Sequence, residues 1–408
     1  MNILVFNSGS SSIKYRLFDM SRVSVIASGV LQRIGESDAS LVHKSVLADG
    51  SHQSITRSQQ ISDHRQGMQQ INAVLQQTSL RRDSPPLRGI GHRMAHGGSM
   101  FHHPTRIDAS VLDAIRQLGD LAPLHNPASV AGIEQALAAF PGVAQVVVFD
   151  TAFHQTLPPH AYRYAVPRDF AHRLHVRRYG FHGTSYQYVT RQAARRLGRS
   201  STSLNLIALH LGNGSSAAAI RGGISVDTSM GMTPMAGLVM GTRCGDLDPA
   251  VVFHLLRHTD LTPDRLEAIL NRDSGLLGLC GHNDMREILE LAAAGDDDAQ
   301  QAFEVYVYAI KKYIGAYYAV LGRVDAVLFT GGIGENSAPI RWRVCQGLQG
   351  LGIVLDPDRN DACPPTGGSV HAANSPVAVL VEPTDEQLEI AEQTLQTIQG
   401  SDASFTPP

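Results

Sequence analysis

The sequence lacks several features that would assign it to a common class of protein. Its 408 residues carry a net charge of −3, so no excess of positive charge points to nucleic acid or an anionic membrane surface as a partner. No apolar run is long enough to cross a bilayer. The four cysteines show no C-x-x-C spacing, which favours free thiols over a disulfide framework or a zinc site. We therefore expect a cytoplasmic protein with small-molecule partners.

Two common nucleotide-binding motifs are also missing, the P-loop G-x-x-x-x-G-K-[ST] and the Rossmann G-x-G-x-x-G. In their place, Asn7-Ser8-Gly9-Ser10-Ser11-Ser12-Ile13-Lys14 separates two apolar runs, as in a hairpin. The backbone N–H groups and hydroxyls of such a turn can converge on an anion, and Lys14 adds a positive charge. Alone, the segment is better interpreted as an ordinary Ser-rich β-turn, because Gly/Ser turns are common.

The same arrangement occurs again later in the chain. A strand expected at 204–210 is followed by Leu211-Gly212-Asn213-Gly214-Ser215-Ser216 and a second apolar run, and a strand expected at 326–329 runs into Gly331–Asn336. Three Gly-rich turns that each follow an apolar strand predict nucleotide phosphates held between two related halves.

Hydrophobic spacing and capping signals predict the remaining elements. An N-terminal, mostly antiparallel sheet is expected before residue 60. Further strands are expected at 88–94, 144–149 and 377–381, and helices at 63–80, 108–118, 127–140, 249–258, 262–271, 285–294 and 299–321. We place the domain boundary directly after Asp150. Arg16 and Arg173 are expected to be solvated.

Several motifs, in this order, closely resemble those of the acetate kinases, a family within the sugar kinase/Hsp70/actin superfamily, over essentially the full chain. Besides the Gly-rich turns, they are His92–Gly98, Pro123–Pro127, Phe149–His154, Tyr179–Ser185, Asp227–Pro234 and Gly241–Pro249. The resemblance implies an α/β, two-domain, duplicated actin-like ATPase (ribonuclease H-like) fold with an interdomain nucleotide cleft. Residues 1–150 plus 384–400 would form the N-terminal domain and residues 151–383 the nucleotide-binding domain.

The resemblance further implies a homodimer that reversibly transfers the ATP γ-phosphoryl group to acetate, giving acetyl phosphate and ADP with Mg²⁺, or alternatively Mn²⁺, as cofactor. The implied catalytic residues are Asp150, His182 and Arg243, and the implied metal ligands are Asn7 and Glu386. The implied substrate-binding residues are Arg93, Ala95, Leu124, His125, Phe181 and Pro234. The implied ATP-binding residues are Ser10, Ser12, Lys14, His210, Leu211, Gly212, Asn213, Gly214, Asp284, Met285, Arg286, Gly332, Ile333, Gly334, Glu335 and Asn336.

Physical chemistry agrees with several of these roles and leaves others open. A carboxylate acceptor is already deprotonated at neutral pH, so the site has to bring two anions together and needs no strong base. Two arginines suit this task, since a guanidinium binds carboxylate or phosphate oxygens with a planar fork. Asp150 could orient Arg93, hold the water shell of the metal or transfer a proton. His125 and His210 could be ligand-binding or structural.

Two departures from the family pattern bear on specificity. The segment Ser274–Arg286 is one residue shorter than usual and carries Cys280 and His282, which leaves the nucleotide base open. Ala95 stands where acetate kinases generally carry Val and propionate kinases tend to carry Ala, so propionate is the alternative acceptor.

Two rival functions come from other classes, an actin- or Hsp70-type ATPase and a sugar kinase. The first would not need Arg93, His182 and Arg243 around an acceptor. The second would need a base for a hydroxyl proton and a polar sugar pocket, whereas Leu124 and Phe181 predict an apolar one.

Overall fold

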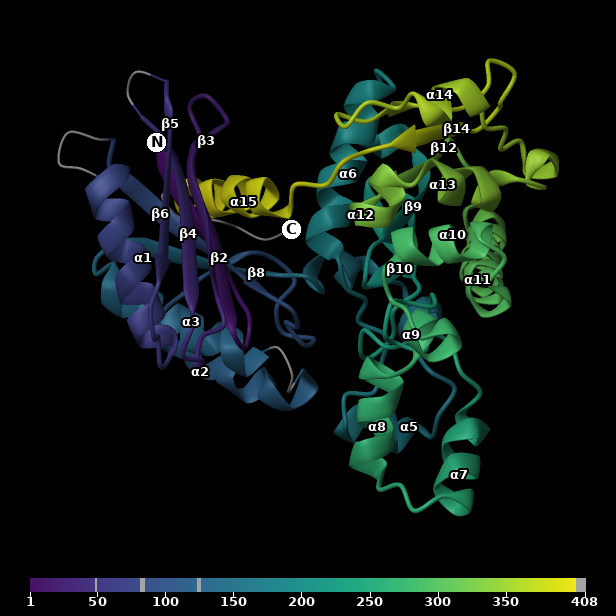
Figure 1. The fold of residues 1–408 in the computed structure, drawn as a ribbon, viewed down its shortest axis with the longest axis horizontal. Coiled ribbons are helices and arrows are strands. Elements are labelled where there is room, and N and C mark those ends of the chain that lie inside the picture. Colours follow the sequence, from purple (N-terminus) through teal and green to yellow (C-terminus); the bar gives the residue numbers. More distant parts are fainter. Residues whose placement is uncertain (48–49, 81–84, 123–125, 401–408) are drawn as a thin grey trace. The chain divides into compact units, whose positions relative to one another are not determined.

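The computed structural model describes residues 1–47, 50–80, 85–122 and 126–400 of the chain (Figure 1). The chain divides into two compact units. The first consists of Met1–Ala152 together with Asp385–Pro408, and the second of Phe153–Thr384.

The first unit is built on an eight-stranded mixed sheet with the order β5-β4-β3-β2-β1-β6-β8-β7. Its strands are β1 (Asn2–Ser8), β2 (Ser12–Asp19), β3 (Ser24–Gln32), β4 (Ser40–Val46), β5 (His52–Ser58), β6 (Leu87–Met94), β7 (Thr105–Arg106) and β8 (Ala144–Phe149). Its helices are α1 (His64–Thr78), α2 (Ala109–Gln117), η1 (Leu118–Leu121), α3 (Asn126–Ala139) and α15 (Glu386–Gly400). Strands β1, β6 and β8 run parallel, whereas β1 to β5 form the expected antiparallel meander.

Helices cover both faces of this sheet because alternate strand residues are apolar on each side. On one face Leu4 and Phe6 pack with residues of α1 and α3. On the other face Ile3 and Val5 pack against Ile390 of α15, the helix near the C-terminus. The closing helix therefore belongs to the first unit, although the whole second unit separates it in sequence from Met1–Ala152.

The second unit contains a six-stranded sheet with the order β11-β10-β9-β12-β14-β13. Its strands are β9 (Asn205–Leu211), β10 (Ser215–Arg221), β11 (Ile224–Thr228), β12 (Ala326–Thr330), β13 (Gly368–Ser369) and β14 (Ala378–Val381). Its helices are α4 (Pro159–Tyr162), α5 (Arg168–Arg173), α6 (Gly183–Arg196), η3 (Ser201–Ser203), α7 (Pro249–His258), α8 (Pro263–Arg272), α9 (Gly275–Cys280), α10 (Met285–Ala293), α11 (Asp297–Leu321), α12 (Gly331–Asn336), α13 (Ala338–Cys345), η4 (Gln349–Leu351) and α14 (Pro357–Asp361). The short helix η2 (Ala152–Thr156) lies where the chain passes from the first unit to the second.

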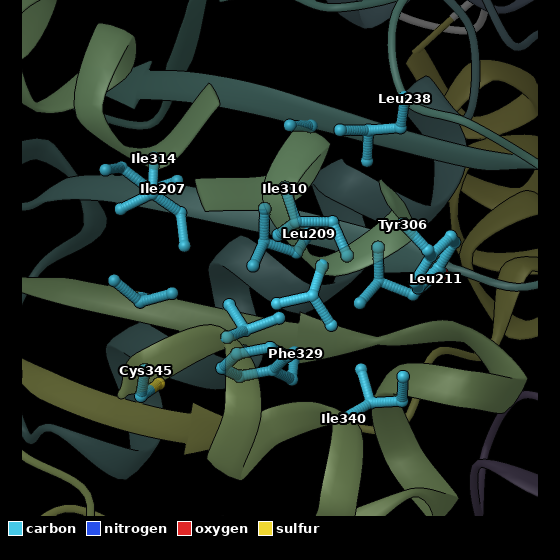
Figure 2. Packing of buried hydrophobic residues seen from close by; sticks show 14 of the residues in the cluster. Ile207, Leu209, Leu211, Leu238, Tyr306, Ile310, Ile314, Phe329, Ile340 and Cys345 are labelled. Atoms are coloured by element: carbon cyan, nitrogen blue, oxygen red, sulfur yellow. The ribbon is translucent and has the colours of Figure 1, made fainter. Parts of the chain in front are cut away.

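The core of the second unit lies between its sheet and the long helix α11. Figure 2 shows Ile207, Leu209 and Leu211 of β9 beside Tyr306 and Ile310 of α11. The side chains of these residues are buried, so this core holds the turn after β9 on a rigid support.

The two sheets share one topology. The order β3-β2-β1-β6-β8-β7 corresponds strand for strand to β11-β10-β9-β12-β14-β13, with the same parallel and antiparallel pairings. Strands β4 and β5 are an addition to the first sheet. This correspondence confirms the duplicated α/β fold expected from the two Gly/Ser turns.

The third Gly-rich segment differs from the expectation. We expected a turn at Gly331–Asn336, but the segment forms the short helix α12. Gly331 has a φ of +76°, and a Cβ there would lie 2.7 Å from the carbonyl oxygen of Leu211. The chain therefore bends sharply at a glycine and enters a helix directly after the strand.

Candidate active site

Three implied site residues of the first unit lie at one edge of its sheet, namely the metal ligand Asn7, the substrate-binding Arg93 and the catalytic Asp150. Asn7 and Arg93 are the penultimate residues of β1 and β6, and Asp150 directly follows β8. These three strands are adjacent and parallel. Parallel strands end at the same edge of a sheet, where open α/β sheets bind their ligands.

Arg93 is held by two carboxylates. Its Nε and Nη2 donate to the two carboxylate oxygens of Asp150 at 3.2 and 2.5 Å, and its Nε lies 3.6 Å from Oε2 of Glu386. Asp150 is buried, whereas Arg93 is only partly buried. The Asp150 and Glu386 carboxylates raise the pKa of the Arg93 guanidinium, so Arg93 stays charged. These contacts with Asp150 and Glu386 fix the plane of the Arg93 guanidinium.

A cavity of about 250 Å³ lies beside Arg93. It is lined by Asn7, Ser8, Gly9, Ser10, Ser11, Ser12, Arg93, Ala95 and Ser129. The Ser-rich turn is held in shape by a hydrogen bond from Gly9 N to Ser12 O at 2.8 Å and by a 2.8 Å contact between His64 Nε2 and Gly9 O. Ser129 of α3 was not predicted, because nothing in the sequence of that helix connects it with the first hairpin.

Lys14 does not line this cavity. It lines a separate one of about 340 Å³ together with Arg16 and Lys44. Arg16, which was expected to be solvated, has a side chain that is 38% exposed, and its Nη1 also donates to both carboxylate oxygens of Asp385, at 3.1 and 3.0 Å. The prediction for Arg173 is confirmed, because its side chain is 65% exposed and pairs with Asp169, which is 67% exposed.

The second unit contains a larger cavity of about 770 Å³. Its predicted lining residues are Gly212, Asn213, Asp284, Met285, Arg286, Gly332, Ile333 and Asn336, and it is also lined by Asn283, Leu289, Ser337 and Pro339. Half of the sixteen predicted nucleotide residues therefore meet around one space, to which three distant segments contribute and which is large enough for a nucleoside. Asn283 and Ser337 directly adjoin the predicted residues, whereas Leu289 and Pro339 lie three residues beyond Arg286 and Asn336. Cys280 and His282, which raised the question of base preference, are not among the lining residues.

Other residues predicted to bind the nucleotide stabilise the segments that carry the lining residues. Leu211 is fully buried in the core. The Glu335 carboxylate accepts hydrogen bonds from the backbone N–H groups of Gly331 and Thr384 at 2.9 and 3.1 Å. The carbonyl of Gly334 accepts from the buried guanidinium of Arg341 at 3.0 Å.

His182, His210 and Arg243 gather around Gly214 in the second unit. The imidazole rings of His182 and His210 stack with centroids 4.1 Å apart. A Cβ on Gly214 would lie 3.4 Å from Arg243 Nη2 and 3.7 Å from His182 Cε1, so glycine allows the loop to approach both side chains. Arg243 Nη1 donates to the carbonyl of Pro234 at 2.8 Å. Burial lowers the pKa of Arg243, so its charge has been removed from water in advance.

Of the other four residues predicted to bind the substrate, the structure describes two. Phe181 is buried in a small cluster with Met230 and Met240, and Pro234 is partly buried. Leu124 and His125 lie outside the described residues.

No helix in the described part of the chain is long and apolar enough to span a membrane. No group of three or more His, Cys, Asp or Glu side chains in these residues is arranged to hold a metal ion.

Comparison with known proteins gives matches over nearly the whole chain. A sequence model described as the acetokinase family matches residues 2–392. The acetate kinase of Syntrophobacter fumaroxidans is 51% identical over 399 residues, which cover 98% of this chain and 97% of that protein. The acetate kinase of Streptomyces coelicolor is 52% identical over 401 residues, with coverages of 98% and 97%.

Solved structures agree. The crystal structure of Porphyromonas gingivalis acetate kinase superposes with a TM-score of 0.91 at 39% identity, covering 97% of this chain and 99% of that one. A propionate kinase from Francisella tularensis gives a TM-score of 0.90 at 38% identity, with the same coverages.

Proposed function

This chain belongs to the acetokinase family, and from that premise we propose that it reversibly transfers the γ-phosphoryl group of ATP to acetate, giving acetyl phosphate and ADP. The observation that carries the proposal is the partly buried Arg93, fixed by Asp150 and Glu386 at the wall of a cavity beside the Ser-rich turn. A guanidinium held in one plane is suited to bind a planar carboxylate with two parallel hydrogen bonds.

The proposed division of labour follows from where charge has to be neutralised. Arg93 binds the acceptor carboxylate, and Asp150 orients Arg93, since the acceptor brings no proton that a base must remove. His182 and Arg243 donate to the oxygens of the phosphoryl group during transfer. Residues 1–150 plus 384–400 form the N-terminal acetokinase-like domain, and residues 151–383 form the nucleotide-binding domain.

The residues present also suit Mg²⁺, or alternatively Mn²⁺. Asn7 and Glu386 offer an amide oxygen and a carboxylate, the hard donors that Mg²⁺ prefers, and Asn7 lines the same cavity wall as the Arg93 guanidinium that Glu386 contacts. When bound, the ion would neutralise charge on the nucleotide phosphates. Magnesium retains much of its water shell, so two protein ligands suffice for this assignment.

We further propose a homodimer that acts in the cytoplasm. Helix α7 (Pro249–His258) has no buried residue, and it exposes Val251 and Phe253. Such exposed apolar side chains are typical of an interface between subunits. The four cysteines are free thiols, as in proteins of a reducing compartment. Light scattering should give a dimer mass for the wild type and a lower mass for Phe253→Asp.

Propionate is the second candidate acceptor. Ala95 lines the cavity beside Arg93, and its small side chain leaves room for one more carbon than Val would. The propionate kinase among the similar structures is consistent with this alternative.

One experiment tests the function directly. Hydroxylamine traps acyl phosphates as hydroxamates, so ATP and the enzyme are incubated with acetate, propionate, butyrate or glucose. Hydroxamate should form with acetate and propionate, and not when Arg93 is replaced by Ala. Phosphorylation of glucose would identify a sugar kinase, and ATP hydrolysis that does not depend on any acceptor would identify an ATPase. Either result would overturn the proposal.

A further inference from the structure

His182 stands in a constrained position. It precedes α6 with a left-handed φ of 57°, a conformation that residues other than glycine rarely adopt. The surrounding structure has to impose this conformation, and such positions gather at functional sites. One element of that structure is His154, whose Nε2 lies 2.9 Å from the carbonyl oxygen of Phe181, the residue before His182.

A buried hydroxyl pair lies behind the His182 ring. Nδ1 of His182 is 2.9 Å from Oγ of Ser216 on β10, and this Oγ is 2.5 Å from the hydroxyl of Tyr186. Tyr186 lies four residues after His182, on the first turn of α6, and both Ser216 and Tyr186 are fully buried. Burial raises the pKa of Tyr186, so its phenol keeps its proton at neutral pH.

The distances admit two directions of donation along His182, Ser216 and Tyr186. If Tyr186 donates to Ser216 and Ser216 donates to Nδ1 of His182, the neutral imidazole carries its proton on Nε2. In the opposite direction Nδ1 carries the proton and Nε2 presents a lone pair. Only the first direction leaves an Nε2–H group that can donate to a phosphoryl oxygen.

We propose that Ser216 and Tyr186 are positioning residues that fix His182 as the Nε2–H tautomer, so that Nε2–H is the donor to an oxygen of the transferred phosphoryl group. This inference rests on the proposed role of His182 in phosphoryl transfer. The two hydroxyls act through His182 and touch no substrate. A wrong tautomer would present a lone pair to a phosphoryl oxygen, and lone pair and oxygen repel each other.

We call the hydrogen-bonded series His182, Ser216 and Tyr186 the relay. Tyr186→Phe removes its last hydroxyl and keeps the aromatic ring. We expect kcat to fall by about 10-fold or more, while KM for ATP and acetate changes by less than about 2-fold, since orientation is lost and not binding. Nitrogen NMR of protein labelled with ¹⁵N-histidine should show His182 of the wild type as the Nε2–H tautomer and a mixture of tautomers in Tyr186→Phe. His182→Gln assigns the signal.

The chain offers a matched control on the same strand. The hydroxyl of Tyr306, also fully buried, lies 3.3 Å from Oγ of Ser215, the neighbour of Ser216. Tyr306→Phe therefore removes an equivalent buried tyrosine–serine hydrogen bond without touching the relay. It should leave both kcat and the His182 signal as in the wild type.

A second variant keeps the test decisive. Ser216→Ala should have at least the effect of Tyr186→Phe, and the double variant should be no worse than Ser216→Ala alone, because the hydroxyls act in series. An unchanged tautomer in both single variants would overturn the proposal, as would equal losses of kcat in Tyr186→Phe and Tyr306→Phe. Because the tautomer is measured on the free protein, it tests the relay even if the wild type forms no acyl phosphate, a result that would refute the proposed function instead.

Discussion

At the scale of single residues, Arg243 combines partial burial with a charge that forms no ion pair with a carboxylate in the part of the chain that the structure describes. Its Nη1 donates to the carbonyl of Pro234, and its guanidinium lies beside Gly214. A cation removed from water in advance stabilises charge that develops during the reaction more than charge already present in the substrate. Arg243 should therefore matter more for turnover than for binding.

Arg243→Ala is expected to lower kcat by ~10³-fold with a smaller change in KM. Steady-state kinetics with ATP and acetate measures both. Arg22→Ala, which removes an exposed arginine between β2 and β3, serves as the control and should behave as the wild type. Comparable kcat values for Arg243→Ala and the control would remove Arg243 from the mechanism.

Ala95 is the residue from which the length of the acyl pocket can be predicted. It lines the cavity that also contains Arg93, so a larger side chain there should shorten the space available to the acyl tail. One methylene in an apolar pocket is worth roughly 1–3 kcal/mol of discrimination. Ala95→Val should therefore lower the ratio of kcat/KM for propionate to that for acetate by ~10-fold. If the ratio stays where it is, Ala95 does not set the pocket length.

Single residues also show which parts of the site could be predicted from the sequence. Asn7, Arg93 and Asn213 stand in short motifs, and each reaches a cavity. Neighbours within the same motifs can lie in the core instead, as Leu211 does, because alternate strand residues face opposite sides of a sheet. Ser129 enters the site only through tertiary packing, of which the sequence of α3 contains no sign.

At the scale of elements, the long helices were predictable and the short connections were not. Helix α7 occupies the predicted range, and α11 begins two residues before the predicted start. Strands β11 and β13 went unpredicted because pairing with their neighbours, and not a periodic pattern of their own, defines them. The bend before α12 depends on the backbone of β9, which is far away in sequence.

A prediction at this scale concerns helix α12. Its C-terminal carbonyl groups accept hydrogen bonds from a side chain of the next helix, α13. The side chain of Arg341 on α13 is 2% exposed and donates to the carbonyls of Gly334 and Glu335 at 3.0 and 2.9 Å, and to Asn360. Arg341→Met would leave these buried oxygens without a donor. We expect a loss of about 3 kcal/mol in the free energy of unfolding and a higher KM for ATP.

Arg343 on the same helix is the matched control for Arg341. Its side chain is 38% exposed, and its ion pair with Glu304 lies at the surface. Arg343→Met should cost less than about 1 kcal/mol, as surface ion pairs do. Urea unfolding followed by circular dichroism compares the two variants, and equal losses would show that the buried position of Arg341 has no special weight.

At the scale of the whole molecule, each unit contributes a buried histidine that makes stability depend on pH. Burial lowers the pKa of His92 in the first unit and of His154 in the second to about 4, from an ordinary value of 6.5. Between these values the unfolded chain binds a proton on each histidine and the folded chain does not. Stability should therefore fall as the pH is lowered from about 6.5 to about 4, by up to roughly 3 kcal/mol for each histidine, and neither contributes above that range.

His154→Gln isolates one of these two contributions. The variant should show a shallower dependence of the free energy of unfolding on pH below about 6.5, by up to about 1.4 kcal/mol per pH unit, because one proton fewer is taken up on unfolding. A glutamine amide can still donate to the carbonyl of Phe181, so the variant should remain folded. Urea titrations at several pH values between about 7 and 5 measure the slope, and His52→Gln, which changes an exposed histidine of β5, should leave it unaltered. If His154→Gln and His52→Gln both keep the slope of the wild type, the buried imidazole of His154 is not what ties folding to pH.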